Sequence, residues 1–384
     1  MSNRPPVSVR KVETPQELKA FLNFPWTVFK DDPNWAPPLV SMRHELFDKQ
    51  KHPAWDYIEG DYYAAWRGDQ IVGTIVPFIN KRHNEFWNEN IAWFGGFDVL
   101  EDDEAAKALF DTAIAWARER GVEKIRGPQT FTTHDETGLL VDGFERQIIL
   151  MPYNKPYYER MVLAQGFQPS MDTYSFYLGS ADVAKNGLNE RLERITQSII
   201  KRNKISVRPV DRKNMKKEFE LFKELYNAAW DKNWGFVPMT PRELDGLVTS
   251  IGQFFDPDLA YYAYVGDDPA GFILGIPDFN QILHKIRPRP GKPEIISLLQ
   301  ALYYWKIKKS ITWARVPLMG VKEEYRNKGV DVVMYSHLLN SVLNKNYAHS
   351  DSGWILSTNE SMVSIALNFG SRIYRTYRYY DYQL

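Results

Sequence analysis

The chain has 384 residues, which is too long for one ordinary compact domain, so we expect two domains. Its 48 basic and 48 acidic residues balance, which excludes a global field that would attract nucleic acid or a membrane surface. Cys is absent, which excludes disulfides, thiolate metal sites and a Cys nucleophile. The amino-terminal residues lack an apolar signal segment, and no apolar run reaches membrane-spanning length. We therefore expect a cytoplasmic protein without a nucleic-acid or membrane partner.

The first half of the chain shows clear strand and helix patterns. Alternating apolar residues predict a β-hairpin over residues 62–79, followed by a strand at 91–99. The Gly95-Gly96 pair inside that strand predicts a bulge. A helix is predicted over 103–120 because it starts with acids, ends with bases and is followed by Gly121. The remaining predicted elements are a strand at 124–127, a helix that begins at Asn154, and a closing strand at 167–178.

A long loop, residues 129–152, separates two of these elements and is rich in Thr, His, Asp and Glu. Loops of this length in a compact domain are frequently functional. His134 and Asp135 are candidate substrate-binding residues, because a His oriented by a carboxylate can take a proton from an amine. The alternative is a surface loop stabilised by its own turns. The acids and the His lack metal-ligand spacing, so no metal site is predicted.

Short segments of the first half recur in the second half in the same order, at an offset of about 200 residues, which is a typical domain length. Their collinearity indicates that one structural plan occurs twice. The pairs are Val9-Arg10-Lys11-Val12 with Val207-Arg208-Pro209-Val210, Asn34-Trp35 with Asn233-Trp234, Tyr62-Tyr63-Ala64 with Tyr261-Tyr262-Ala263, and the Pro77 and Pro277 segments that end in Asn80 and Asn280.

Two segments have no counterpart in the first half. An insertion at 281–310 contains a helix, residues 294–309, with an apolar face and a terminal lysine cluster. Packing of this helix over the domain junction is favoured over membrane contact. A basic stretch at 185–223 spans the join between the copies and overlaps a predicted linker helix at 181–204. The charges of this stretch favour a solvated helix, and a site for an anionic ligand is the second interpretation.

A strand–turn–helix pattern spans residues 318–346 of the second half, because the hydrophobic period changes there. The turn reads Arg326-Asn327-Lys328-Gly329, which places two cations and a glycine where the helix starts. A helix N-terminus offers unpaired N–H groups and the positive end of its dipole. This turn therefore suits a phosphate group.

The turn resembles the acyl-CoA-binding motif of the GNAT superfamily of N-acyltransferases, Gln/Arg-x-x-Gly-x-Gly/Ala. Arg326 and Gly329 match its first two key positions, and Asp331 replaces the last Gly or Ala. That carboxylate repels an anion and can stabilise the helix start by itself. Gly127-Pro128 and the Tyr153–Tyr158 segment also resemble a bacterial double-GNAT group.

The resemblance implies an α/β (α+β) fold of two GNAT-like domains, at 1–180 and 205–384. Each is a mostly antiparallel mixed sheet flanked by helices, and the fourth and fifth strands separate to admit acyl-CoA. Acidic residues at 101–104 argue against a cofactor in the first domain. The resemblance therefore implies acetyl-CoA or another acyl-CoA in the second domain. The implied cofactor-binding residues are Met319, Val321, Arg326, Asn327, Lys328, Gly329, Val330, Asp331 and Asn359, and Asn359 is equally well explained as a helix N-cap.

The implied function is acyl-CoA-dependent N-acyl transfer to a small amine or amino-acid-like acceptor. The Tyr acid common in GNAT enzymes has no counterpart at 365–370, and the tyrosines at 374–380 are interpreted as core, so the catalytic residues are undetermined. One alternative is a non-catalytic GNAT-like binding protein. Another is a Fem-type transferase that uses aminoacyl-tRNA, although neutral charge disfavours an RNA partner.

Overall fold

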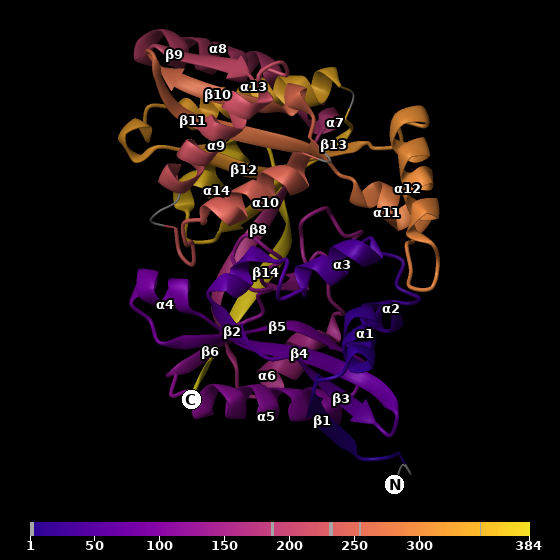
Figure 1. Cartoon of the computed structure of the whole chain (residues 1–384). Coiled ribbons are helices and arrows are strands. Elements are labelled where there is room, and N and C mark those ends of the chain that lie inside the picture. The colour runs from indigo at the N-terminus through magenta and orange to yellow at the C-terminus, as the bar shows by residue number, and fades with distance from the viewer. Residues whose placement is uncertain (1–3, 186–187, 230–232, 253–254, 346) are drawn as a thin grey trace. The chain divides into compact units, whose positions relative to one another are not determined.

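The computed structural model describes residues 4–185, 188–229, 233–252, 255–345 and 347–384 (Figure 1). Its contacts divide the chain into two compact units. The first unit holds the residues up to Asp172 together with Asn280–Lys308 and Arg375–Leu384. The second unit holds Thr173–Phe279 and Lys309–Tyr374. Both units therefore draw on both halves of the sequence.

The sheet of the first unit has the strand order β1-β3-β4-β5-β6-β14, with β2 beside β4 and β7 beside β14. All of its pairs are antiparallel except β5 with β6, which is parallel. The predicted hairpin and the strands that follow it are confirmed, and β7 lies in a segment that the sequence predicted as loop. The strands are β1 (Val7–Lys11), β2 (Ile58–Gly60), β3 (Tyr63–Arg67), β4 (Gln70–Asn80), β5 (Ile91–Val99), β6 (Lys124–Gly127), β7 (Leu139–Asp142) and β14 (Arg372–Gln383).

Helices of the first unit form where the sequence supplies caps. The Thr14 hydroxyl accepts from the backbone amide of Glu17, and the Glu17 carboxylate accepts from the backbone amide of Thr14. Together these bonds form a capping box. Asn154, predicted as a helix start, instead bonds both backbone groups of Leu140 in β7, and the helix begins three residues later. The helices are α1 (Pro15–Asn23), α2 (Pro25–Val28), α3 (Val40–Leu46), α4 (Lys81–Trp87), α5 (Asp103–Glu119), α6 (Tyr157–Ala164), α11 (Asn280–Ile286) and α12 (Glu294–Leu302).

The sheet of the second unit has the order β8-β13-β12-β11-β10-β9, in which only β12 with β13 is parallel. Residues 186 and 187 of the predicted linker helix lie outside the described residues; α7 and α8 flank them. The strands are β8 (Gln168–Gly179), β9 (Ile205–Pro209), β10 (Ala260–Val265), β11 (Asp268–Pro277), β12 (Trp313–Val321) and β13 (His349–Leu356). The helices are α7 (Ser180–Lys185), α8 (Leu188–Asn203), α9 (Met215–Ala229), α10 (Pro241–Gly252), α13 (Val330–Asn344) and α14 (Glu360–Asn368).

Each unit is a mostly antiparallel mixed sheet flanked by helices, which confirms the predicted fold class. The single parallel pair lies at the same place in both. The β5–β6 ladder ends at Trp93 and Arg126, and the β12–β13 ladder ends at Val316 and Ser352. Beyond Val316 and Ser352, β12 and β13 continue without pairing to each other, whereas in the first unit β6 ends at Gly127 and the backbone amide of Gln129 still donates to the Phe94 carbonyl of β5. The separated strands are the feature that positions the site.

The closing strands are exchanged between the sequence halves. The last residues of β14, Tyr380–Gln383, pair with β6 in the first unit, and the later part of β8 pairs with β13 in the second. Arg126 of β6 bonds Asp381 of β14 through Nε at 2.8 Å and Nη2 at 2.9 Å. Tyr379 and Tyr380 of β14 are fully buried, which confirms their prediction as core residues. The sequence predicted a closing strand for each half but not this exchange.

The inserted segment of the second half belongs to the first unit, where Figure 1 shows orange α11 and α12 near indigo α2 and α3. The α12 helix packs through its small residues Ser297 and Ala301, which are buried. Its large apolar residues are exposed, so the expectation that its apolar face is packed is wrong. None of the helices within the described ranges is long and apolar enough to cross a bilayer.

Candidate functional site

The predicted phosphate turn of the second unit connects β12 to α13. A 3₁₀ turn at Glu323–Tyr325 follows the strand, and Gly329 precedes the first helical residue with φ of 78°. Only glycine adopts that conformation without strain. A side chain there would also place its Cβ 2.8 Å from Cγ2 of Ile199 in α8. Gly329 is therefore required both by the backbone and by the helix that packs against the turn.

The two cations of this turn have different surroundings. Arg326 is half-buried, and its Nη2 donates to the carbonyl of Ala229 at 2.8 Å, so it ties the turn to the end of α9. Lys328 is exposed, with Nζ 4.8 Å from the centre of the Tyr325 ring. Its carbonyl accepts from Asn203 of α8 at 2.6 Å. Lys328 is thus the cation that faces solvent, whereas Arg326 holds the backbone in place.

The backbone amides at this helix start are unpaired. The N–H groups of Lys328, Gly329, Val330 and Asp331 have no acceptor among the residues that the structure describes. The next amide, that of Val332, donates to Oδ1 of Asp331 at 2.8 Å. A run of unpaired N–H groups at the positive end of a helix is suited to an anion, and the Asp331 carboxylate occupies only the amide that follows this run.

Three further predicted cofactor residues lie on neighbouring elements. Met319 and Val321 belong to the part of β12 beyond its ladder with β13, where they pair with Ile273 and Gly271 of β11. Asn359 accepts from the amide of Met362 at 3.2 Å, so it caps α14 as its alternative explanation required. Asn327 has φ of 62° and is exposed. The turn and the free part of β12 therefore lie consecutively in one unit, and Asn359 already has a structural role.

The equivalent place in the first unit is closed by the protein itself. Asp102 caps α5 by accepting from the amide of Ala105 at 3.1 Å, and its carboxylate also bonds Arg67 at 2.7 Å. Where β5 and β6 separate, Gln129 donates from its amide to the Phe94 carbonyl at 2.9 Å. A Cβ on Gly95 would lie 1.9 Å from the Gln129 carbonyl oxygen. The main chain of Gln129 therefore lies against β5 at this opening, and the Asp102 carboxylate caps the start of α5.

The long loop of the first unit brings a different set of groups together. The carboxylate of Asp135 accepts from Oγ1 of Thr132 at 2.7 Å and lies 3.3 Å from Nε2 of His52. The backbone amide of His134 donates to Thr132 at 3.2 Å. The structure thus places Asp135 beside His52, a partner that the sequence did not predict because it lies 83 residues away.

Two carboxyl groups with raised pKa values lie in the same unit. Desolvation raises the pKa of Glu136 to about 7; Arg43 opposes that shift, while Asp98 and Asp135 add to it. Glu136 as a whole residue is nevertheless exposed. Desolvation also raises the pKa of Asp98, which lies 3.3 Å from Nη2 of Arg43. A carboxyl group that is half ionised near neutral pH is suited to accept a proton from an amine.

One feature of the sequence marks this cluster. Asp98 interrupts an otherwise apolar strand, which is unusual because a buried carboxylate needs a partner. Glu136 lies next to the predicted His134 and Asp135 and has no distinguishing pattern of its own. No group of three His, Asp or Glu side chains in the described ranges is arranged to hold a metal ion.

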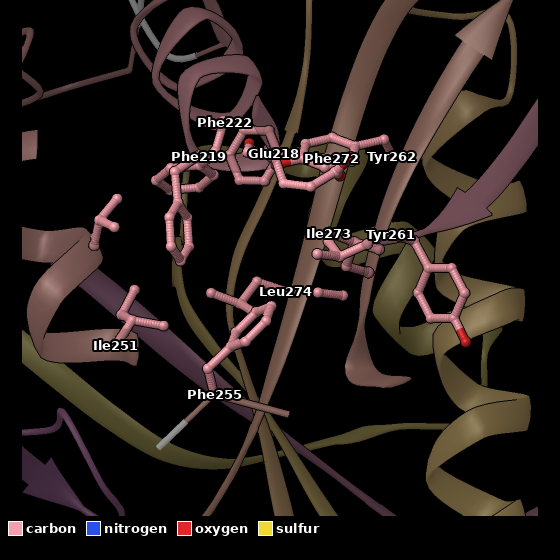
Figure 2. Close-up of a pocket in the computed structure, with 13 residues that line it drawn as sticks. Glu218, Phe219, Phe222, Ile251, Phe255, Tyr261, Tyr262, Phe272, Ile273 and Leu274 are labelled. Atoms are coloured by element: carbon pink, nitrogen blue, oxygen red, sulfur yellow. Dashed lines mark hydrogen bonds between the residues drawn. The ribbon is translucent and has the colours of Figure 1, made fainter. Parts of the chain in front are cut away.

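A partly open apolar pocket in the second unit lies between α9, α10 and strands β10 and β11 (Figure 2). Its volume is about 40 Å³. Phe219, Phe255 and Ile251 point toward one another in Figure 2, whereas the Tyr261 ring points away from them. A pocket of this size holds only a few water molecules, so we assign it no ligand.

The chain is similar over nearly its full length to two known bacterial proteins. It is 30% identical over 383 residues to Protein YghO of Escherichia coli (strain K12), covering 98% of this chain and 95% of that protein. It is 29% identical over 385 residues to Bacterial ceramide synthase of Caulobacter vibrioides, covering 98% of this chain and 97% of that protein. No protein-family model matches the chain.

Solved structures share the fold at low sequence identity. A tandem GNAT protein from the clavulanic acid biosynthesis pathway superimposes with a TM-score of 0.54 at 12% identity and covers 98% of both chains. A GCN5-related glucosamine N-acetyltransferase region of a fungal β-N-acetylglucosaminidase gives a TM-score of 0.56 at 12% identity, over all of this chain and 38% of that one. Both show the fold alone.

Proposed function

Because the chain belongs to the family of Protein YghO, whose fold here is that of tandem GNAT N-acyltransferases, we propose that it transfers an acyl group from acyl-CoA to a primary amine. The observation that carries this proposal is the run of four unpaired amides at the start of α13. It follows the part of β12 that pairs with β11 but no longer with β13. In the fold family, this is where a CoA pyrophosphate and pantetheine are held. Acyl-CoA would supply the activated thioester.

The residues present fit such a donor at the turn. The N–H groups of Gly329 and Val330 offer hydrogen bonds to a diphosphate, and Lys328 adds an exposed positive charge. Asp331 weakens the site by its charge, although its Oδ1 already accepts from the Val332 amide. Val330 is buried, so its side chain anchors the helix while its amide faces the turn. We infer that the second unit binds the donor.

We propose a long-chain amine as the acceptor. The relative from Caulobacter vibrioides is named a ceramide synthase, and a ceramide is the amide of a fatty acid and a long-chain amino alcohol. The similarity extends over 98% of this chain, so it includes both units. The small amine expected from the sequence remains the competing acceptor, and the test below includes it.

For the chemical step, we propose Glu136 as the general base. The amine nitrogen forms a bond to the acyl carbon, the carbon–sulfur bond of the thioester breaks, and CoA leaves as the thiolate. The amine must lose a proton in this step, and a carboxylate with a pKa of about 7 accepts it at neutral pH. Asp98 and Arg43 would act as positioning residues, since they set the charge around Glu136.

Release of free CoA by the purified full chain tests the proposed reaction. Acyl-CoA donors of increasing chain length are each combined with a long-chain amino alcohol, with a small primary amine, or with no amine. Amine-dependent CoA release with the long-chain acceptor supports the proposal, and release only with the small amine replaces the acceptor. If calorimetry detects acyl-CoA binding but no amine gives release, the protein is a non-catalytic binder; if nothing binds, the donor assignment is wrong.

A variant of the turn tests the donor site. Arg326→Glu would remove CoA binding but would also break the bond to the Ala229 carbonyl, so a loss could come from misfolding. Lys328→Glu avoids this problem because the Lys328 side chain contacts only the Tyr325 ring among the described residues. Lys217→Glu, at an exposed lysine of α9 in the same unit, is the matched control.

A further inference from the structure

In the inserted segment of the first unit, the large apolar side chains are exposed and the small residues Ser297 and Ala301 are buried. Half of the large exposed apolar side chains among the described residues lie between Glu294 and Ile307. Their exposed fractions reach 61% at Leu299 and 70% at Ile307. Monomeric soluble proteins rarely leave so contiguous an apolar surface in water, and such surfaces mark contact with another body. The seven residues, which we call the apolar ridge, are Ile295, Ile296, Leu298, Leu299, Leu302, Tyr303 and Ile307.

The ridge is held in its exposed position by polar contacts on the opposite side. Glu294 at the start of α12 accepts from both Oγ and the amide of Ser41, at 2.6 and 3.0 Å. The Pro288 carbonyl accepts from Nε1 of Trp26 at 2.7 Å, and Arg287 donates to the Asp32 carbonyl at 3.1 Å. Backbone and side-chain bonds therefore fix the segment to the first unit while its apolar side faces away.

Basic residues surround the ridge. Residues 285–308 contain six lysines and arginines and a single acid, Glu294, whose carboxylate is already bonded to Ser41. Lys306 and Lys308 lie over the rings of Trp305 and Tyr303, at 3.5 and 5.9 Å from the ring centres. The other basic residues of the segment are Lys285, Arg287, Arg289 and Lys292. Their charge is local, since the whole chain is neutral.

We propose that the apolar ridge inserts into the interface of an anionic lipid bilayer. An interfacial helix combines leucine and isoleucine on one face with lysine and arginine at the rim, and Tyr and Trp at the level of the headgroups. The segment of α12 and the following Tyr303–Ile307 turn has all three. The exposed lysines match the negative charge of phosphatidylglycerol-type headgroups. Binding is peripheral, because α12 has nine residues and cannot span a bilayer.

A second copy of the chain fits the ridge less well. In a symmetric dimer the same patch meets itself, so the basic rim of one copy would face the basic rim of the other. That arrangement brings like charges together, and the single acid of the segment, Glu294, is already bonded to Ser41. Membrane binding of this kind also does not depend on the proposed acyl transfer, because it rests on the surface of the first unit alone.

Co-sedimentation of the full-length protein with lipid vesicles tests the proposal. We expect binding to vesicles of phosphatidylcholine mixed with phosphatidylglycerol, and weaker binding to phosphatidylcholine alone, with the difference reduced by salt. Leu299→Glu should weaken binding about tenfold or more, because it replaces an inserted leucine by a charge. Lys306→Glu combined with Lys308→Glu should remove the preference for phosphatidylglycerol.

Leu163→Glu is the matched control, since Leu163 lies on α6 of the same unit with an exposed fraction of 41%. It should bind vesicles as the unmodified chain does. Circular dichroism melting shows whether each variant is folded. Equal binding by folded Leu299→Glu and by the unmodified chain would overturn the proposal. So would a dimer in sedimentation velocity that Leu299→Glu converts to monomers while neither protein binds vesicles.

Discussion

The two strand–helix turns of this molecule occupy the same place in the fold and have opposite chemistry. In the first unit, Asp102 caps the helix and is held by Arg67. In the second, Gly329 starts the helix, the amides around it are unpaired, and Lys328 is exposed. At the first turn a carboxylate held by an arginine occupies the helix start, whereas at the second turn no side chain caps the helix and a lysine is exposed beside it.

This difference indicates a division of roles within a duplicated fold. A carboxylate at a helix start is a stable solution that needs no ligand. The first unit adopts it and fills the strand opening with the main chain of Gln129. Its unusual groups are instead the carboxyls of Glu136 and Asp98, with raised pKa values. We therefore expect the affinity for acyl-CoA to respond to changes at the second turn and not at the first.

The largest effect is expected from Glu136→Gln. If Glu136 is the base, removal of its charge should lower kcat about 100-fold or more, with little change in affinity for acyl-CoA. Because desolvation raises its pKa to about 7, the ionised fraction of the unmodified protein grows as the pH rises, so kcat should increase between about pH 6 and 8. Steady-state CoA release measures both.

Glu145→Gln serves as the control for that change, because it makes the same substitution at an exposed glutamate between residues 129 and 152. It should retain the kcat and the pH profile of the unmodified chain. A Glu136→Gln protein with normal kcat at pH 8 would remove Glu136 from the reaction and leave the first unit without an assigned chemical role.

A smaller effect is expected from Lys328→Glu in the second unit. Reversal of this exposed charge should weaken the affinity for acyl-CoA about tenfold, and more at low salt, while kcat at saturation is unchanged. Isothermal titration gives the dissociation constant, with Lys217→Glu as the control. Equal affinities for the two variants would show that the turn does not bind the diphosphate.

Asp102→Ala tests whether the first turn is purely structural. Loss of the N-cap should lower the free energy of unfolding by about 1 to 2 kcal/mol, since the Ala105 amide loses its acceptor. The affinity for acyl-CoA should not change. Asp111→Ala, farther along α5 where Asp111 pairs with Lys107 at 2.6 Å, should cost less. New acyl-CoA binding by Asp102→Ala would mean that charge alone closes the first turn.

The smallest effect is expected from Asp331→Asn. The amide oxygen can still accept from the Val332 amide, so the helix start is kept while the negative charge is removed. Affinity for acyl-CoA should rise about threefold, in line with one charge near a helix terminus. Binding that appears only in this variant, and not in the unmodified chain, would favour the non-catalytic interpretation.

Local patterns were sufficient to predict most elements of the fold from the sequence. The hairpin that became β3 and β4, the helix that follows Asp102, and the cap at Asn359 all depend on residues close together in the chain. The collinear echoes predicted the duplication, because both copies keep the same turn and strand signals. The turn at Gly329 could also be predicted, because its residues Arg326 to Gly329 are consecutive in the sequence.

The remaining features depend on contacts between distant residues. Nothing local in β14 distinguishes pairing with β6 from pairing with a strand of its own half; the bonds from Arg126 to Asp381 span 255 residues. The partner of Asp135 and the desolvation of Glu136 are likewise set by the fold. For α12, the sequence correctly predicted an apolar stripe, but the expectation that this stripe packs against protein was wrong, because its large side chains are exposed.

The exchange of closing strands has a consequence for synthesis on the ribosome. The first unit contains the opening residues of the chain, yet its sheet lacks β14 until Arg375–Leu384 have been translated. Until then Ile125 in β6 has no neighbour on that side and stays exposed to unwanted association. The part of the protein that is made first is thus among the last to be completed, and neither half can be expected to mature when expressed alone.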